Sequence, residues 1–149
     1  MTIVFLHECG HILAAYSSGG QVLDSSIFGT SGHVLAEGGS HGFILWAGYG
    51  FAIFITSILM GICIQQRSRA TPVIGLFWVL ALIDPVSDAV SASQALNDIH
   101  LLTERSGFTT PFLIVSWMIV GASSCITTYF VRGFIVKRGS AEPSEAPPQ

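Results

Sequence analysis

Charged residues are scarce in this sequence. The 149 residues include 6 lysines and arginines and 9 aspartates and glutamates, so charged residues make up 10% of the chain. A water-soluble domain usually carries about a quarter. Hydrophobic residues make up 50%, and the composition therefore predicts a single domain, residues 1–136, embedded in the lipid bilayer. No stripe of basic residues is present, which argues against nucleic acid as a partner.

The sequence also has few cysteines and no recognisable signal-peptide pattern. The three cysteines, Cys9, Cys63 and Cys125, are odd in number and lie in apolar segments, so no disulfide framework is expected. The first apolar run is not preceded by a basic region, and we expect no cleavable signal peptide.

The first apolar run contains the pattern His-Glu-x-x-His. On a helix, His7 and His11 lie one turn apart on the same face. Two imidazoles in this arrangement can bind one Zn²⁺, and Glu8 beside them can handle the proton of a water at the metal. Charged groups in a membrane-type helix are costly and usually functional. The alternative is a chance match in which the histidines are hydrogen-bonded core residues.

The apolar runs predict an all-α polytopic membrane protein with about four transmembrane helices, at residues 2–17, 43–65, 71–95 and 111–136. The first would reach only ~24 Å, short of the ~30 Å hydrocarbon core. In the second, Gly48 and Ala52 have a spacing that would let the motif helix approach closely.

The connections between these runs differ in character. Residues 17–42 are rich in glycine and serine. Either a β-hairpin, with short strands at 22–23, 27–28 and 33–35 around a glycine turn at 29–32, or an unstructured connector is expected. Residues 96–110 predict a short amphipathic helix with Asn97 or Asp98 near its N-cap and Gly107 as its stop. The tail, residues 137–149, is expected to be disordered.

The third run is interrupted by Asp84-Pro85, and Asp88 lies one turn beyond Asp84. Proline is expected to kink or unwind the helix there. A bilayer tolerates such a break only against protein or a wet cavity. The two carboxylates are therefore either helix caps near the interface or part of a functional site.

Basic residues predict the orientation. With four spans, both termini and the loop with Arg67 and Arg69 share one side, which also holds Arg132, Lys137 and Arg138, whereas the other side holds only Arg105. The positive-inside rule then puts both termini in the cytoplasm of a cell (inner) membrane.

Several motifs together resemble the M50 metallopeptidases, the site-2-protease-like intramembrane zinc proteases, and in particular their M50B-like branch. The motifs that carry the resemblance are His7-Glu8-Cys9-Gly10-His11-Ile12-Leu13-Ala14-Ala15, Ser18-Gly19-Gly20, Gly38-Gly39-Ser40 and Ala47-Gly48-Tyr49. Asn97-Asp98, Leu101-Leu102 and Ser106-Gly107-Phe108 look like that branch's Ser-Asp-Ala stretch and the residues after it.

The resemblance implies a zinc ion held by two histidines and a distal aspartate. Carried over by residue, His7 and His11 become ligands, Glu8 the catalytic acid/base and Asp98 the third ligand. The sequence departs from other branches because it contains no Leu-Asp-Gly. The depth of each residue in the bilayer favours Asp84 instead. His7, His11 and Asp84 would lie at comparable depths along their spans, whereas Asp98 is predicted at the opposite membrane face and would have to reach inward. Asp98 is our first choice because the pattern after it resembles the family, and Asp84 is the second.

The function expected from these features is intramembrane hydrolysis of peptide bonds in transmembrane or membrane-associated protein substrates. Other membrane proteins are considered as partners in addition to the substrate. Residues 21–35 could offer a strand edge to an unwound substrate. Two other hypotheses stay open: a catalytically inactive M50-like subunit that acts as a scaffold in a larger membrane complex, and an ion or proton carrier using Glu8, Asp84 and Asp88.

Overall fold

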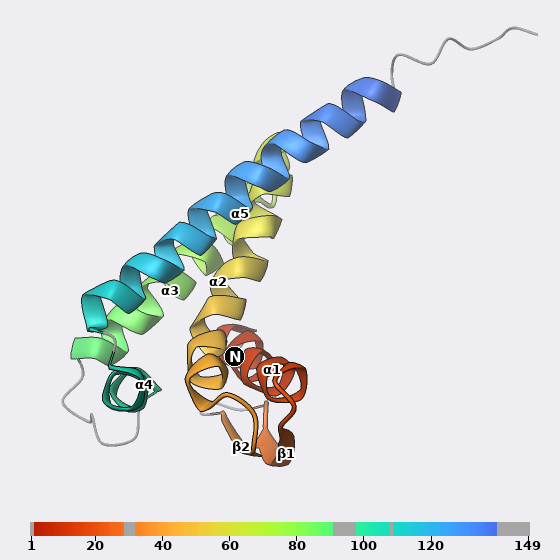
Figure 1. The fold of residues 1–149 in the computed structure, drawn as a ribbon. Helices are drawn as coiled ribbons and strands as arrows, with labels where there is room; N and C mark the ends of the chain where they lie inside the picture. The colour runs from red at the N-terminus through yellow and green to blue at the C-terminus, as the bar shows by residue number, and fades with distance from the viewer. Residues whose placement is uncertain (1, 29–31, 91–97, 108, 140–149) are drawn as a thin grey trace, which may run out of the picture.

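The described residues of the computed structural model, 2–28, 32–90, 98–107 and 109–139, form five helices and two strands (Figure 1). In chain order the elements are α1 (Thr2–Ser17), β1 (Gln21–Ser26), β2 (His33–Glu37), α2 (His41–Gln65), α3 (Thr71–Val90), α4 (Asp98–Ser106) and α5 (Thr110–Gly139). This confirms the prediction of a mostly helical fold. The last residues of the predicted tail, 140–149, lie outside the described residues.

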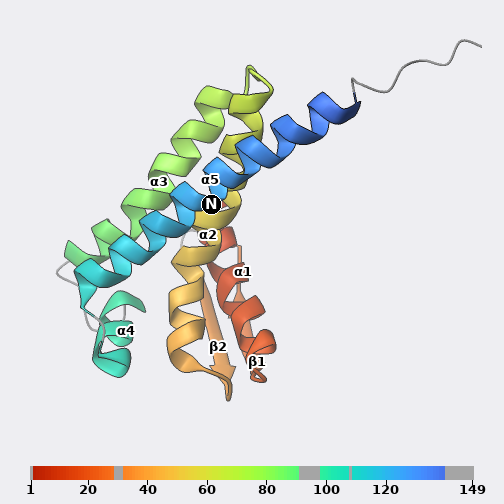
Figure 2. The ribbon, with the colours of Figure 1, turned by 45° about the horizontal axis from the view of Figure 1, so that its top comes forward.

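Helices α2, α3 and α5 are each long and apolar enough to cross a membrane. Helix α2 packs against both of the others, whereas α3 and α5 share a smaller contact (Figures 1 and 2). Side-chain hydrogen bonds link them: Trp78 Nε1 donates to Ser57 Oγ at 2.8 Å, and Trp46 Nε1 donates to Ser116 Oγ at 3.0 Å. Polar bonds of this kind hold helices together in lipid, where hydrophobic attraction between helices is weak.

Helix α1 forms over the predicted residues, but the prediction of a fourth span is not confirmed. It has 16 residues, which at 1.5 Å per residue reach ~24 Å. It runs antiparallel to the first half of α2: Ile3 packs against the cluster that contains Tyr49 and Ile53, while Ala14 packs with Ile44. The two helices approach closely at Gly10, where a Cβ atom would lie 2.3 Å from the carbonyl oxygen of Ala47.

A two-stranded antiparallel hairpin separates α1 from α2, in agreement with the hairpin interpretation of residues 17–42. Helix α1 ends at Ser17, and the chain turns away from it at Gly19, whose φ of 82° suits glycine, while Gly20 N–H donates to the carbonyl of Ala15. Strand β1 ends at Ser26, so the strand predicted at residues 27–28 is wrong. Phe28 instead stacks on Phe5 of α1, with ring centroids 5.7 Å apart. Of the glycine turn predicted at residues 29–32, residues 29–31 lie outside the described residues.

Helix α3 continues through Pro85 to Val90, so the helix is not unwound at Asp84-Pro85 as the sequence had allowed. Pro85 is fully buried, as is Ala81 four residues before it, so the turn that lacks one hydrogen bond lies against protein. Residues 91–95 of the predicted span are outside the described residues.

The short helix predicted within residues 96–110 is α4, which begins at Asp98 and stops before Gly107, where φ is 71°. Its apolar residues Ile99 and Leu102 are buried in the main core cluster. The other buried members of this cluster are Tyr49, Ile53, Ala81, Leu113 and Trp117. Because α4 inserts these two side chains between the longer helices, its first residue is drawn in toward α1.

Candidate metal centre

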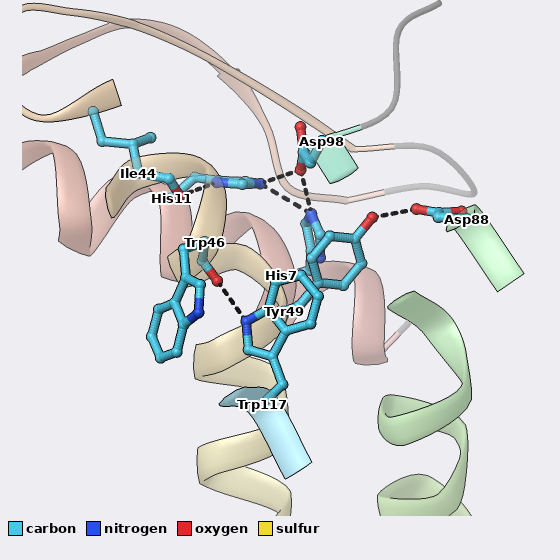
Figure 3. Close-up of polar contacts among 8 residues, drawn as sticks. All are labelled: His7, His11, Ile44, Trp46, Tyr49, Asp88, Asp98 and Trp117. Carbon is cyan, nitrogen blue, oxygen red and sulfur yellow. Dashed lines mark hydrogen bonds and ion pairs between the residues drawn. The ribbon is translucent and has the colours of Figure 1, made fainter. Parts of the chain in front are cut away.

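Three potential metal ligands meet where α1 and α4 approach each other (Figure 3). His7 Nε2 and His11 Nε2 lie 2.9 Å apart. Asp98 Oδ2 lies 2.9 Å from the first and 2.8 Å from the second. Two imidazole nitrogens and one carboxylate oxygen form a donor set that Zn²⁺ binds in proteins, with a fourth position left for water or substrate.

The helical spacing of His7 and His11 brings their rings to one face of α1, with centroids 4.6 Å apart. Opposite them, α2 presents Gly48. A Cβ atom there would lie 2.6 Å from the His11 ring and 2.8 Å from His7 Nε2. The small residue predicted to allow helix packing therefore also makes room for the two imidazoles.

His11 is oriented by the backbone of α2. Its Nδ1 lies 2.7 Å from the carbonyl oxygen of Ile44, and since a carbonyl only accepts, Nδ1 carries a proton. In the neutral ring, Nε2 then holds a lone pair that faces the carboxylate oxygen of Asp98 at 2.8 Å. Two lone pairs at that distance need a cation between them, either a proton or a metal ion. The donor set and the tautomer thus both fit a metal site.

Asp98 is the first residue of α4 and only partly exposed. Burial acts to raise the pKa of its carboxyl, but the hydrogen bonds and charges of His11 and His7 outweigh this and hold the pKa well below its usual range. The ionised carboxylate is the form in which an aspartate binds a metal ion.

Glu8 lies beside this group with 6% of its surface exposed. It lines a cavity of about 410 Å³, whose other lining residues are His7, His11, Gly32, His33, Val34, Ile44, Leu45, Tyr49, Asp88 and Asp98. A Cβ atom at Gly32 would lie 2.4 Å from the Glu8 carboxyl. The segment leading into β2 therefore packs directly on this carboxyl and forms one wall of the cavity.

The structure brings together His7, Glu8, His11 and Asp98 of the predicted site residues. Asp84 is not part of the three-ligand group. Asp88 lines the same cavity and accepts a hydrogen bond from the Tyr49 hydroxyl. Sequence reasoning did not identify Tyr49 or His33 as cavity residues; the signal available for Tyr49 was its place in the Ala47-Gly48-Tyr49 motif.

A model of the family described as Peptidase M50B-like matches residues 1–84. The matched part includes α1 with its His-Glu-x-x-His pattern, the hairpin and α2, whereas Asp98 lies beyond it. No curated protein and no solved structure matches the chain. Since the family model covers more than half of the 149 residues, and three helices can cross a membrane, the chain is an integral membrane protein that belongs to the M50B-like peptidase family.

Proposed function

We propose that this protein is an intramembrane zinc metallopeptidase that hydrolyses peptide bonds of membrane protein substrates. His7, His11 and Asp98 would hold the zinc ion, and Glu8 would act as the acid/base. The observation that carries the proposal is the convergence of two imidazole nitrogens and one carboxylate oxygen within 2.9 Å of one another, beside the buried carboxyl of Glu8. Membership of a peptidase family supports it independently.

Zinc at this position would supply Lewis acidity, lowering the pKa of a water to about 7 and polarising a substrate carbonyl. Glu8 takes the proton of the attacking water through its carboxylate and later gives it to the leaving amine as the peptide C–N bond breaks. The Ile44 carbonyl keeps the proton of His11 on Nδ1, so Nε2 stays available as a ligand. The packing of Gly32 on Glu8 fixes the carboxyl beside the ligand group.

The substrate would enter as an extended chain along β2. His33 and Val34 of this strand line the cavity. In the described part of the sheet, β2 pairs only with β1, so its other edge can accept a peptide by strand addition. A photo-crosslinker at position 34 should capture a trapped substrate, and one at Leu23 in β1 should capture it less. Equal capture at both positions would contradict this route.

The membrane orientation follows from basic residues. Arg67 and Arg69 connect α2 to α3 at one end of the bundle, and the C-terminal end of α5 lies at that end too (Figure 1). We place this end in the cytoplasm by the positive-inside rule. The earlier placement of both termini on one side depended on four spans, whereas three candidate spans are present in the described residues.

Cleavage of a panel of reporter proteins tests the proposal. Each reporter carries one apolar span between two tagged soluble domains and is reconstituted with the purified protein in liposomes. We expect cleavage of at least one reporter, a loss of about 10²- to 10⁴-fold in Glu8→Gln, and no loss in Glu104→Gln, which changes an exposed residue of α4. A chelator should abolish cleavage and added zinc should restore it. Zinc binding without any Glu8-dependent cleavage would favour the inactive scaffold instead.

A further inference from the structure

Tyr49 is fixed on three sides at the wall of the cavity (Figure 3). Its hydroxyl donates to Asp88 Oδ2 of α3. Its ring meets the His7 ring edge-to-face, with centroids 4.4 Å apart and an interplanar angle of 84°. On its other side it packs on Trp117, with centroids 5.0 Å apart. Only 2% of Tyr49 is exposed, so its position is determined by these neighbours.

Asp88 lies near the C-terminal end of α3, and ten residues later the chain reaches Asp98. A carboxylate in a membrane helix is costly unless it has a partner, and the Tyr49 hydroxyl provides one. The bond joins α3 to α2 at the level of the ligand group. It therefore acts on both sides of that group: on His7 through the tyrosine ring, and on Asp98 through the packing of α3 against α4, the helix that begins at Asp98.

The geometry argues against a direct catalytic role for either residue. The hydroxyl of Tyr49 has one proton, which it gives to Asp88, so it has none to donate to a substrate oxygen. Asp88 is not among the three residues whose ligand atoms converge. What remains is a role in orienting the ligands. His11 is oriented by the Ile44 carbonyl. The His7 ring is oriented by a different contact, its edge-to-face packing on the Tyr49 ring.

We propose that Tyr49 and Asp88 form a positioning pair for the metal centre, in which the hydrogen bond between them sets the orientation of His7 and the approach of Asp98. This inference rests on the proposed zinc site. Neighbours that orient metal ligands typically change metal affinity 10- to 100-fold when they are altered.

Zinc affinity of the detergent-purified full chain, measured by competition with a chromophoric chelator, tests the pair. Tyr49→Phe keeps the ring and removes the hydroxyl, and we expect it to raise the dissociation constant about 10- to 100-fold. Asp88→Asn retains an oxygen that accepts the hydroxyl proton, so it should stay within a few-fold of the unmodified protein. Tyr129→Phe, which removes a hydroxyl from a partly exposed tyrosine of α5, is the matched control and should change nothing.

The double variant Tyr49→Phe/Asp88→Ala separates positioning from stability. Tyr49→Phe removes the hydroxyl that donates to the Asp88 carboxylate, whereas the double variant removes both groups of this hydrogen bond and should recover part of the melting temperature lost in Tyr49→Phe. A positioning pair predicts that zinc affinity stays low in the double variant and that its Co²⁺-substituted form has an altered visible spectrum. Recovery of affinity together with melting temperature, or normal affinity in Tyr49→Phe, would overturn the inference alone. Absence of zinc binding by the unmodified chain would overturn the proposed function as well.

Discussion

His11 Nδ1 lies 2.7 Å from the carbonyl oxygen of Ile44. Through this contact the backbone of α2 determines which nitrogen of His11 faces His7 and Asp98. The ligand group is therefore not a property of α1 alone, although the His-Glu-x-x-His pattern lies entirely within it. It depends on how closely α1 packs on α2, which Gly10 and Gly48 allow.

Gly48→Ala should weaken metal binding. The added methyl group would lie 2.6 Å from the His11 ring and 2.8 Å from His7 Nε2, so both imidazoles must move. We expect the zinc dissociation constant to rise about 10-fold or more, measured by chelator competition. Gly133→Ala in α5 is the control, because its Cβ would meet no atom within 4 Å. Equal zinc affinity in the two variants would contradict the geometry of this contact.

Gly10→Ala should destabilise the fold. Its Cβ would come within 2.3 Å of the Ala47 carbonyl oxygen, a backbone atom that cannot turn aside as a side chain does. Forcing an extra methyl group into a packed contact costs about 1–3 kcal/mol. The melting temperature of the metal-free protein in detergent should fall, while Gly42→Ala, with open space around its Cβ, should leave it unchanged. An unchanged melting temperature in Gly10→Ala would mean that α1 and α2 lie farther apart than described.

Gly32→Ala should separate zinc binding from catalysis. The new methyl group would lie 2.4 Å from the Glu8 carboxyl, which can swing away because it is the end of a side chain. Glu8 would then be out of place for proton transfer, with an expected loss of about 10²-fold in the cleavage rate of a reporter substrate. His7, His11 and Asp98 are not displaced, so the zinc content should be retained. Full activity in this variant would argue that Glu8 does not act from the position it occupies here.

The sequence predicted the helices well because their signals are local. Apolar runs placed α1, α2 and α5 to within a few residues, and Gly107 marked the end of α4. The path of α3 through Pro85 was not predictable, since it depends on the burial of that proline against other helices. The strand expected at residues 27–28 failed for a similar reason, because Phe28 packs on Phe5 of α1.

The candidate site divides in the same way. His7, Glu8 and His11 lie within one helix turn or so of one another, and their spacing alone indicates a shared role. The choice between Asp84 and Asp98 required tertiary information: depth along the spans pointed to Asp84, but α4 buries Ile99 and Leu102 in the core and so carries Asp98 inward. The Tyr49–Asp88 contact joins residues 39 positions apart in the chain, and no local pattern indicates it.

Zinc content of the detergent-purified protein, measured by elemental analysis, shows whether the three ligands bind a metal ion. A site formed by His7, His11 and Asp98 should hold about one zinc per chain, lost in His11→Ala and in Asp98→Ala and retained in Asp84→Ala. Retention in Asp98→Ala together with loss in Asp84→Ala would contradict the ligand assignment. No zinc in the unmodified protein, even after reconstitution with the metal, would contradict the account as a whole.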